Sequence, residues 1–305
     1  MMSEVEECES RSSCERESCE GCPSKEKPNF LEEMNPLSSI DHVIGIVSGK
    51  GGVGKTCISI NTAYALAESW KVRVLFIDMD KQANASYWFE SDKTKGTLGN
   101  ILVKGTDAEE VADIKPMSAE EVIQKTRYPR IDLIAADPNL LEINLAILKN
   151  QVGRQDNILK EALKSVRDKY DVCIVDNPPD SNVPVLNGLE IINDVIAVTL
   201  PNRFSLNGIE QLENEIQNYN SILKLNINIR GILVNQFTST TSCYEILEEL
   251  KTKGYKDKIF PYIRGGKPTQ KWLDRVINER KSIYELTPSS GFGRDLIKFI
   301  EALVG

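Results

Sequence analysis

Residues 45–57 read GIVSGKGGVGKTC and contain the complete phosphate-binding pattern Gly-x-x-x-x-Gly-Lys-Thr at positions 49–56. Glycines let backbone N–H groups approach a phosphate closely, and a helix that begins near Lys55 adds its positive N-terminal partial charge. In this pattern we expect Lys55 to reach the β- and γ-phosphates and the Thr56 hydroxyl to bind Mg²⁺. A chance match is the alternative, but the loop follows a strand ending at Val47, as the pattern requires. The residues expected to contact the nucleotide are Gly49, Lys50, Gly51, Gly52, Val53, Gly54, Lys55, Thr56 and Cys57.

The loop contains a second lysine, Lys50, that a phosphate-binding pattern does not require. The segment KGGVGKT resembles the deviant Walker A motif of the ParA/MinD ATPases. This resemblance implies that Lys50 reaches across a nucleotide-sandwich homodimer to the partner's phosphates. There it would be catalytic, because it stabilises the charge that develops during phosphoryl transfer. A solvated lysine beside a glycine turn is the alternative. Cys57 departs from the family, where a second hydroxyl residue is usual, and a thiol is the poorer donor to a phosphate.

Two strands that end in aspartate extend the resemblance. VLFIDMDKQANAS resembles the family's Asp-x-Asp motif, which implies that Asp78 lies near the Mg²⁺ shell and that Asp80 orients or activates the attacking water. YDVCIVDNPPDSN resembles the Walker B strand, with Asp176 as the Mg²⁺ ligand and Pro178 and Pro179 opening the following switch. Carboxylates at the ends of adjacent parallel strands converge where such sheets bind ligands. Taken singly, each aspartate could instead cap a helix or form a turn.

Two weaker matches follow later in the chain. GILVNQF resembles the strand whose asparagine contacts adenine, which implies this role for Asn235, and IFPYIRG places Pro261 in the loop that would pack on the base. A polar strand end and a turn residue are the alternatives. LPNRFSLNGIEQL resembles the chromosome and plasmid partition branch of the family. The C-terminal DLIKFIEALVG is amphipathic, but Glu301 offsets its one cation, Lys298, so we predict a core-packing helix rather than a membrane-binding tail.

The remaining pattern predicts one doubly wound α/β domain over residues 41–305, with a mostly parallel P-loop NTPase sheet covered by helices on both faces. Residues 94–130 are expected to form helices and loops between strands. Residues 1–40 lack apolar periodicity and are predicted to be a short acidic, Cys-rich N-terminal tail. The predicted strands lie in the runs HVIGIVS, VRVLFID, IDLIAA, YDVCIVD, DVIAVTL and NIRGILVN.

The tail raises a second possibility for function. Its four cysteines include the pair in SCEGCPS and resemble the N-terminal segment of the Mrp/Nbp-type iron–sulfur carrier ATPases; four thiolates can hold a [4Fe–4S] cluster or Zn²⁺. Those carriers also have a Cys-x-x-Cys near the end of the ATPase domain, where this chain has only the isolated Cys173 and Cys243. Cys173 lies within the alternating pattern of its strand, where it is most simply a small buried residue. The tail cysteines are Cys8, Cys14, Cys19 and Cys22.

Charge and composition limit the partners. The net charge is −8, and residues 1–41 hold 11 acidic and 4 basic side chains, so the rest of the chain is close to neutral. Partition ATPases commonly bind DNA non-specifically, yet Gln217 and Thr240 stand where basic residues are often found. One histidine, His42, excludes multi-histidine sites, and no apolar run is long enough for a membrane span. The remaining candidates for phosphate contact are Lys256, Lys258, Arg264, Lys267, Lys271 and Arg275.

The first hypothesis is therefore a Mg²⁺-dependent ATPase of the ParA type that forms a homodimer on ATP binding and partitions DNA or positions a cargo. We expect slow hydrolysis without a ParB-like stimulating protein, and a cytoplasmic, nucleoid-associated location. The alternative is an iron–sulfur scaffold or carrier that uses the same dimer. A third, non-catalytic class is a binding switch in which nucleotide state alone matters.

Overall fold

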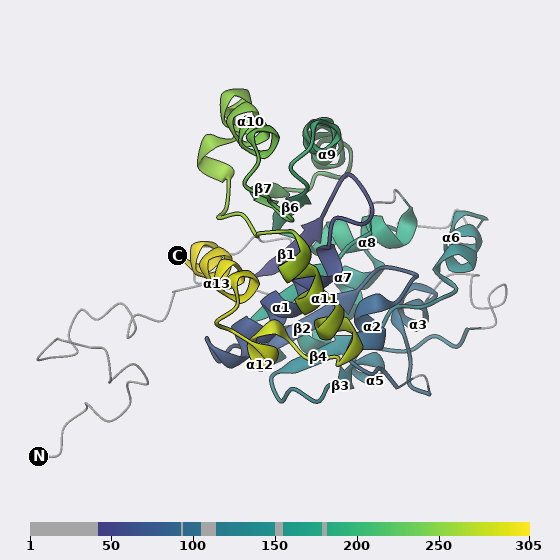
Figure 1. Ribbon diagram of the computed structural model, residues 1–305. Helices are drawn as coiled ribbons and strands as arrows, with labels where there is room; N and C mark the ends of the chain where they lie inside the picture. Colours follow the sequence, from purple (N-terminus) through teal and green to yellow (C-terminus); the bar gives the residue numbers. More distant parts are fainter. Residues whose placement is uncertain (1–41, 93, 105–113, 150–154, 179–181) are drawn as a thin grey trace, which may run out of the picture.

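The computed structural model describes residues 42–92, 94–104, 114–149, 155–178 and 182–305. They form a seven-stranded sheet in the order β3-β4-β2-β5-β1-β6-β7, in which all neighbours run parallel except β3 and β4 (Figure 1). The six predicted strands and the doubly wound arrangement are confirmed. The strands are β1 (Val43–Val47), β2 (Val74–Asp78), β3 (Gln124–Lys125), β4 (Ile131–Ile134), β5 (Val172–Asp176), β6 (Asp194–Thr199) and β7 (Asn228–Val234).

Helices cover both faces of the sheet because successive strand residues point to opposite sides and both sets are apolar. In β1, for example, Val43 and Val47 join one buried cluster, while Ile44 and Ile46 join the other. The first face carries α3 (Leu98–Leu102), α5 (Ala119–Val122), α6 (Leu140–Lys149), α7 (Ile158–Leu163), η2 (Lys164–Lys169) and α8 (Val183–Ile191). The second carries α1 (Lys55–Glu68), α2 (Asn84–Trp88), α11 (Lys267–Asn278), α12 (Ile283–Leu286) and α13 (Gly291–Val304).

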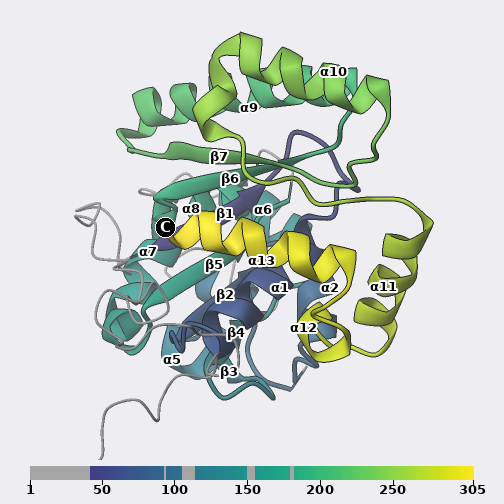
Figure 2. The same cartoon turned by 60° about the vertical axis from the view of Figure 1, so that its left-hand side comes forward.

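A third cluster lies at the β6–β7 edge of the sheet. It is formed with α9 (Arg203–Leu223) and α10 (Thr241–Leu250), and the chain then continues through η3 (Lys251–Tyr255) and η4 (Lys256–Lys258). Figure 2 shows α9, α10 and β7 together at one edge, with α13 crossing the second face.

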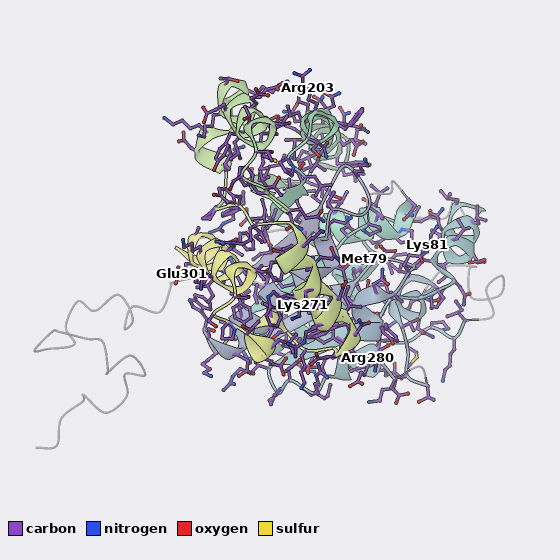
Figure 3. All side chains as sticks on the ribbon, in the orientation of Figure 1. Met79, Lys81, Arg203, Lys271, Arg280 and Glu301 are labelled. Carbon is purple, nitrogen blue, oxygen red and sulfur yellow. The ribbon has the colours of Figure 1, made fainter. Side chains whose placement is uncertain are left out.

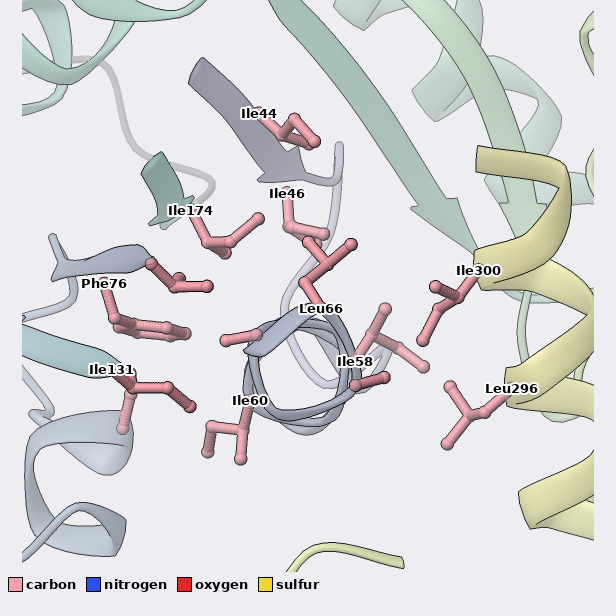
Figure 4. Close-up of a cluster of buried hydrophobic side chains, with 14 of the residues drawn as sticks. Ile44, Ile46, Ile58, Ile60, Leu66, Phe76, Ile131, Ile174, Leu296 and Ile300 are labelled. Atoms are coloured by element: carbon pink, nitrogen blue, oxygen red, sulfur yellow. The ribbon is translucent and has the colours of Figure 1, made fainter. Parts of the chain in front are cut away.

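Helix α1 is the most enclosed helix of the second face, because it lies between the sheet and α13. Ile58 and Leu66 are fully buried among strand side chains on one side and Leu296 and Ile300 on the other (Figure 4). The predicted core-packing role of the C-terminal helix is therefore confirmed, since only Lys298 and its neighbours on the outer face remain exposed. Within the described ranges, no helix combines the length and apolarity needed to span a bilayer.

The prediction of only helices and loops over residues 94–130 was incomplete. The two-residue strand β3 pairs antiparallel with β4 at the sheet edge. It is held by the buried Gln124 amide, whose Oε1 accepts from Asp92 N at 2.7 Å. A two-residue polar strand has no periodicity from which it could be recognised.

Candidate functional site

The carboxyl ends of the parallel strands place the predicted phosphate loop and the acidic residues at one edge of the sheet. Register pairs Asp78 of β2 directly with Asp176 of β5, and Ile46 of β1 with Asp176. The loop leaves β1 and enters α1 at Lys55, as predicted. The convergence expected from the motifs is therefore what the topology produces.

The loop backbone depends on glycine at specific positions. Gly52 and Gly54 have φ of +77° and +91°, in the left-handed region that side chains disfavour. Gly49 needs space instead: a Cβ there would lie 2.7 Å from the carbonyl oxygen of Gly208 in α9. The loop is thus packed backbone against backbone onto the first turns of α9.

The two lysines of the loop occupy different environments. Lys55 is buried, and its Nζ donates to Ser48 Oγ at 3.0 Å, while the Ser48 hydroxyl donates to the carbonyl of Lys50 at 2.6 Å. Lys50 is exposed, and its Nζ lies 5.9 Å from the ring centroid of Phe204 at the start of α9. Lys55 is therefore held inside the loop, whereas Lys50 extends from its outer side.

Two buried carboxylates lie side by side beneath the loop. Burial, followed by the charge of Asp176, raises the pKa of Asp78 to about 7. Burial also raises the pKa of Asp176 to about 6, against the lowering effect of the Thr56 and Ser59 hydroxyls and of Lys55. Ser59 donates to Asp176 Oδ1 at 3.0 Å, whereas the buried Oδ2 has no hydrogen-bond partner among the described residues. An orphaned carboxylate oxygen beside a threonine hydroxyl is a donor set that suits Mg²⁺, a cation that prefers oxygen ligands.

Asp78 has a different set of contacts from Asp176. Its Oδ2 accepts from both the backbone N–H and the hydroxyl of Ser86, and its Oδ1 accepts from the backbone N–H of Asp80 at 3.1 Å. These bonds hold the start of α2 and the loop that carries Asp80. A place for Asp78 near the Mg²⁺ shell stays a prediction.

Asp80 lies half-buried at the site edge. Its Oδ1 accepts from Gln82 N at 2.9 Å, and its backbone carbonyl accepts from Ala83 N at 2.7 Å, which closes a turn after β2. The neighbouring Lys81 is exposed. This turn presents the Asp80 carboxylate on the same sheet edge as the loop, while its action on water stays a prediction.

Asn235 lies against the loop rather than apart from it. Its Nδ2 donates to the carbonyl of Val53 at 2.8 Å, and its Oδ1 accepts from the N–H of Gln236. Asn235 therefore ties the end of β7 to the loop, and its adenine contact stays a prediction. Pro261 is exposed beside Tyr262, whose ring stacks on Phe237 with centroids 4.1 Å apart.

The cysteines give little support for a cluster. Burial raises the pKa of Cys57 to about 12, and its sulfur accepts from Asn61 Nδ2 at 3.5 Å within α1. Cys173 and Cys243 are buried in separate clusters, as expected of isolated residues. Across the described ranges, no three or more His, Cys, Asp or Glu side chains gather into a group that could hold a metal by themselves. Outside the described residues lie Pro179 and the four tail cysteines, Cys8, Cys14, Cys19 and Cys22.

The basic candidates are divided between elements. Lys256 and Lys258 lie on η4, beside β7, whereas Lys267, Lys271 and Arg275 lie on α11, beside α12 and α13. Arg264 is engaged with Asp295 at 2.6 Å, and Arg275 pairs with Glu279. Figure 3 shows Lys271 on α11. DNA contact by these residues stays a prediction.

Sequence reasoning missed four residues that organise the site. Ser48, Ser59 and Ser86 each hydrogen-bond a functional side chain, and Phe204 lies under Lys50. Ser59 could have been identified, because it lies four residues after Lys55 on the same helical face as the loop lysine. The other contacts depend on tertiary packing.

Comparison with known proteins identifies the family. A family model described as an AAA domain matches residues 41–229. The cell division protein PomZ of Myxococcus xanthus is 30% identical over 258 residues, which cover 84% of this chain and 75% of PomZ. The sporulation initiation inhibitor protein Soj of Bacillus subtilis is 31% identical over 221 residues, covering 72% of this chain and 81% of Soj.

Solved structures agree on the fold. Apo McdA of Cyanothece superposes with a TM-score of 0.72 at 18% identity, covering 87% of this chain and 99% of McdA. A plasmid partition protein from Borrelia burgdorferi gives 0.59 at 25% identity, covering 80% and 96%. These relatives do not favour the iron–sulfur carrier alternative. The chain belongs to the AAA-domain family and is a P-loop ATPase of the ParA/MinD type.

Proposed function

We propose that this protein is an ATP-hydrolysing switch that closes into a homodimer on binding ATP and partitions DNA or positions another cargo. The observation that carries the proposal is the separation of the two loop lysines. Lys55 is buried and bonded within its own loop, while Lys50 is exposed, with its ammonium group over the aromatic ring of Phe204. A cation presented outward beside a phosphate site is suited to a nucleotide bound by a second copy.

The residues expected to bind ATP fit this role. Backbone N–H groups of residues 49–56 and the Lys55 ammonium would hold the phosphates. Thr56 and Asp176 would hold Mg²⁺, which neutralises charge on the phosphates. Asp80 would orient the attacking water, and Lys50 would approach the partner's nucleotide. Hydrolysis then requires a dimer, so we expect it to be slow without a stimulating partner.

The proposed cargo follows from the names of the relatives. The chromosome partitioning protein ParA of Myxococcus xanthus is 29% identical over 230 residues, and the Borrelia protein is a plasmid partition protein. We extend partitioning to this chain, with residues 41–305 as the ATPase domain and a ParB-like protein as stimulator. Retention on duplex DNA over a salt series, with ATP, ADP or no nucleotide, tests DNA as the cargo. ATP-selective retention that weakens steeply with salt supports it, whereas no retention in any state leaves a protein cargo.

The test of the switch compares Lys50→Ala with a control variant, Lys271→Ala, in an assay without DNA. The control also removes an exposed lysine, but from α11. We expect Lys50→Ala to lower ATP hydrolysis by about 10³-fold or more, the range of a charge supplied in trans, and to abolish the ATP-dependent dimer. Nucleotide binding by the monomer should persist, because Lys55 is intact. Hydrolysis and dimerisation at wild-type levels in Lys50→Ala would refute the proposal.

A companion variant separates catalysis from switching. Asp80→Ala should dimerise with ATP but hydrolyse it no faster than background. Wild-type protein that dimerises with ATP yet does not hydrolyse it, even with its partner, would instead favour the purely binding switch. Chromatography with light scattering and a phosphate-release assay give both readouts.

A further inference from the structure

Helix α6 carries apolar side chains on its outer side as well as on the side that packs against the sheet, and the described residues cover only the second of these. Ile143 and Ile147 are fully buried against the sheet face, and the buried Asn144 Oδ1 accepts from Val183 N at the start of α8. On the outer face, Leu141, Leu145 and Leu148 are 52%, 52% and 51% exposed. These positions are spaced four and three residues apart, so they form one stripe, the α6 leucine face. A helix with leucines on its outer side as well as its inner side is normally buried on both.

The α6 leucine face begins at the nucleotide site. Leu141 lines a small pocket together with Lys81 and Pro178, which belong to the loops after β2 and β5. Figure 3 shows Lys81 beside α6. The single acidic residue of this part of the helix, Glu142, is exposed and makes no ion pair with the described residues. At its first turn, beside the sheet edge that carries the loop, the face is therefore apolar with one negative charge.

A second exposed surface lies on the other side of the loop, at the start of α9. Phe204 is 78% exposed, the highest value among the large apolar side chains of the described residues. Arg203 beside it is exposed and forms no ion pair with the described part of the chain (Figure 3). The N-terminus of a helix adds positive partial charge. This surface, the α9 start, is thus aromatic and positive.

Sheet topology places these two surfaces symmetrically. The order β4-β2-β5-β1-β6 puts α6, which follows β4, and the α9 start, which follows β6, on opposite sides of β5. At the usual strand spacing the two strand ends are about 19 Å apart. A two-fold axis at the carboxyl end of β5 and perpendicular to the sheet would bring each surface onto the other surface of a second copy. In such an isologous interface, the α6 leucine face of each copy contacts the α9 start of the other.

We propose that the α6 leucine face of one copy packs on the α9 start of a second copy, with Glu142 facing the partner's Arg203. The apolar surfaces match, and the charges are complementary, which is why a second copy is favoured over an unrelated partner. The inference rests on the proposed ATP-dependent homodimer and assigns the surfaces that form it. Three half-exposed leucines are less area than a stable interface needs, so the loop between the two surfaces contributes as well.

The test is a charge swap in the full chain, measured as the dimer dissociation constant by sedimentation with a non-hydrolysable ATP analogue. Glu142→Arg and Arg203→Glu should each weaken the dimer by about 5-fold or more, and the double variant should return to within about 2-fold of wild type. Leu145→Glu should weaken it by about 10-fold or more, because it places a charge in the apolar contact. Ile222→Glu is the matched control, since it changes an exposed apolar residue at the far end of α9 and should leave the dimer unchanged.

The outcomes separate this inference from the proposed function. If the dimer of the double variant is as weak as the two single effects added together, the Glu142–Arg203 pairing is overturned. A Leu145→Glu variant that dimerises like wild type would overturn the α6 leucine face as a dimer surface. A wild-type chain that stays monomeric with the analogue would overturn both the proposed switch and this interface. Retained analogue binding in every variant, measured by fluorescence, shows that the changes act on association.

Discussion

The close contact between the phosphate loop and α9 predicts that Gly49→Ala destabilises the nucleotide-free protein. The added Cβ would lie 2.7, 3.0 and 3.1 Å from the carbonyl oxygen, Cα and carbonyl carbon of Gly208. All three are backbone atoms, so no side chain can rotate to make room. Either the loop or the first turns of α9 must move.

The magnitude follows from two opposing effects. Overpacking costs about 1–3 kcal/mol, while the smaller conformational freedom of unfolded Ala compared with Gly returns about 0.4–1 kcal/mol. We expect a net loss of roughly 1–2 kcal/mol, which corresponds to a fall in Tm of about 2–8 °C for a domain of this size. Gly51→Ala is the control, because a Cβ there meets nothing within 4 Å and its φ is not positive.

Urea unfolding of both variants without nucleotide, followed by circular dichroism, tests this contact. The free energy of unfolding of Gly51→Ala should exceed that of wild type by no more than about 1 kcal/mol. Because its methyl group enters the phosphate cradle, it should still bind nucleotide more weakly. Equal midpoints for the two variants would show that the Gly49–Gly208 approach carries no steric constraint, and the argument would fail.

Two further predictions concern the framework of the domain. Leu296→Ala should lower the free energy of unfolding by about 2–5 kcal/mol, whereas Lys298→Ala should change it by less than about 0.5 kcal/mol; similar urea midpoints would contradict the buried role of α13. The hydrogen bond from Arg73 lowers the pKa of Asp171, so this pair adds stability above the unfolded pKa of 3.8 that is lost as the pH falls through the folded pKa. Because both side chains are about half exposed, Asp171→Asn should cost at most about 1 kcal/mol at pH 7, and its deficit in urea midpoint should shrink as the pH drops below 3.8; a deficit independent of pH would contradict the ion pair.

Most of the sheet could be predicted from sequence because its signals are local. VCIVD and VLFID are continuous apolar runs, which only strands buried on both faces need, and each ends in the carboxylate that the site uses. The loop glycines likewise encode their own backbone conformation, as the positive φ of Gly52 and Gly54 shows. Once the strands are parallel, their carboxyl ends meet at one edge, so the site follows from the order of the elements.

The contacts that tune the site could not be predicted in the same way. Asn235 bonds the carbonyl of Val53 across 182 residues, and Ser86 of α2 bonds Asp78 at the end of β2. Gln124 forms an edge strand through amide bonds to the loop at Asp92, with no apolar pattern to reveal it. Each contact joins two segments whose separate sequences are unremarkable, so it exists only after the chain has packed.

Helix α6 lies between these two cases. The run LLEINLAIL has apolar residues on more than one side of a helix, and sequence alone therefore implies that more than one side is covered. The structure shows which side the chain itself covers, through Ile143 and Ile147, and leaves Leu141 and Leu145 exposed beside the switch loops. Among the described residues, none covers this side of the helix. Because this side begins at the sheet edge that bears Lys50, the proposed second copy would both cover these leucines and receive the lysine that extends from the loop.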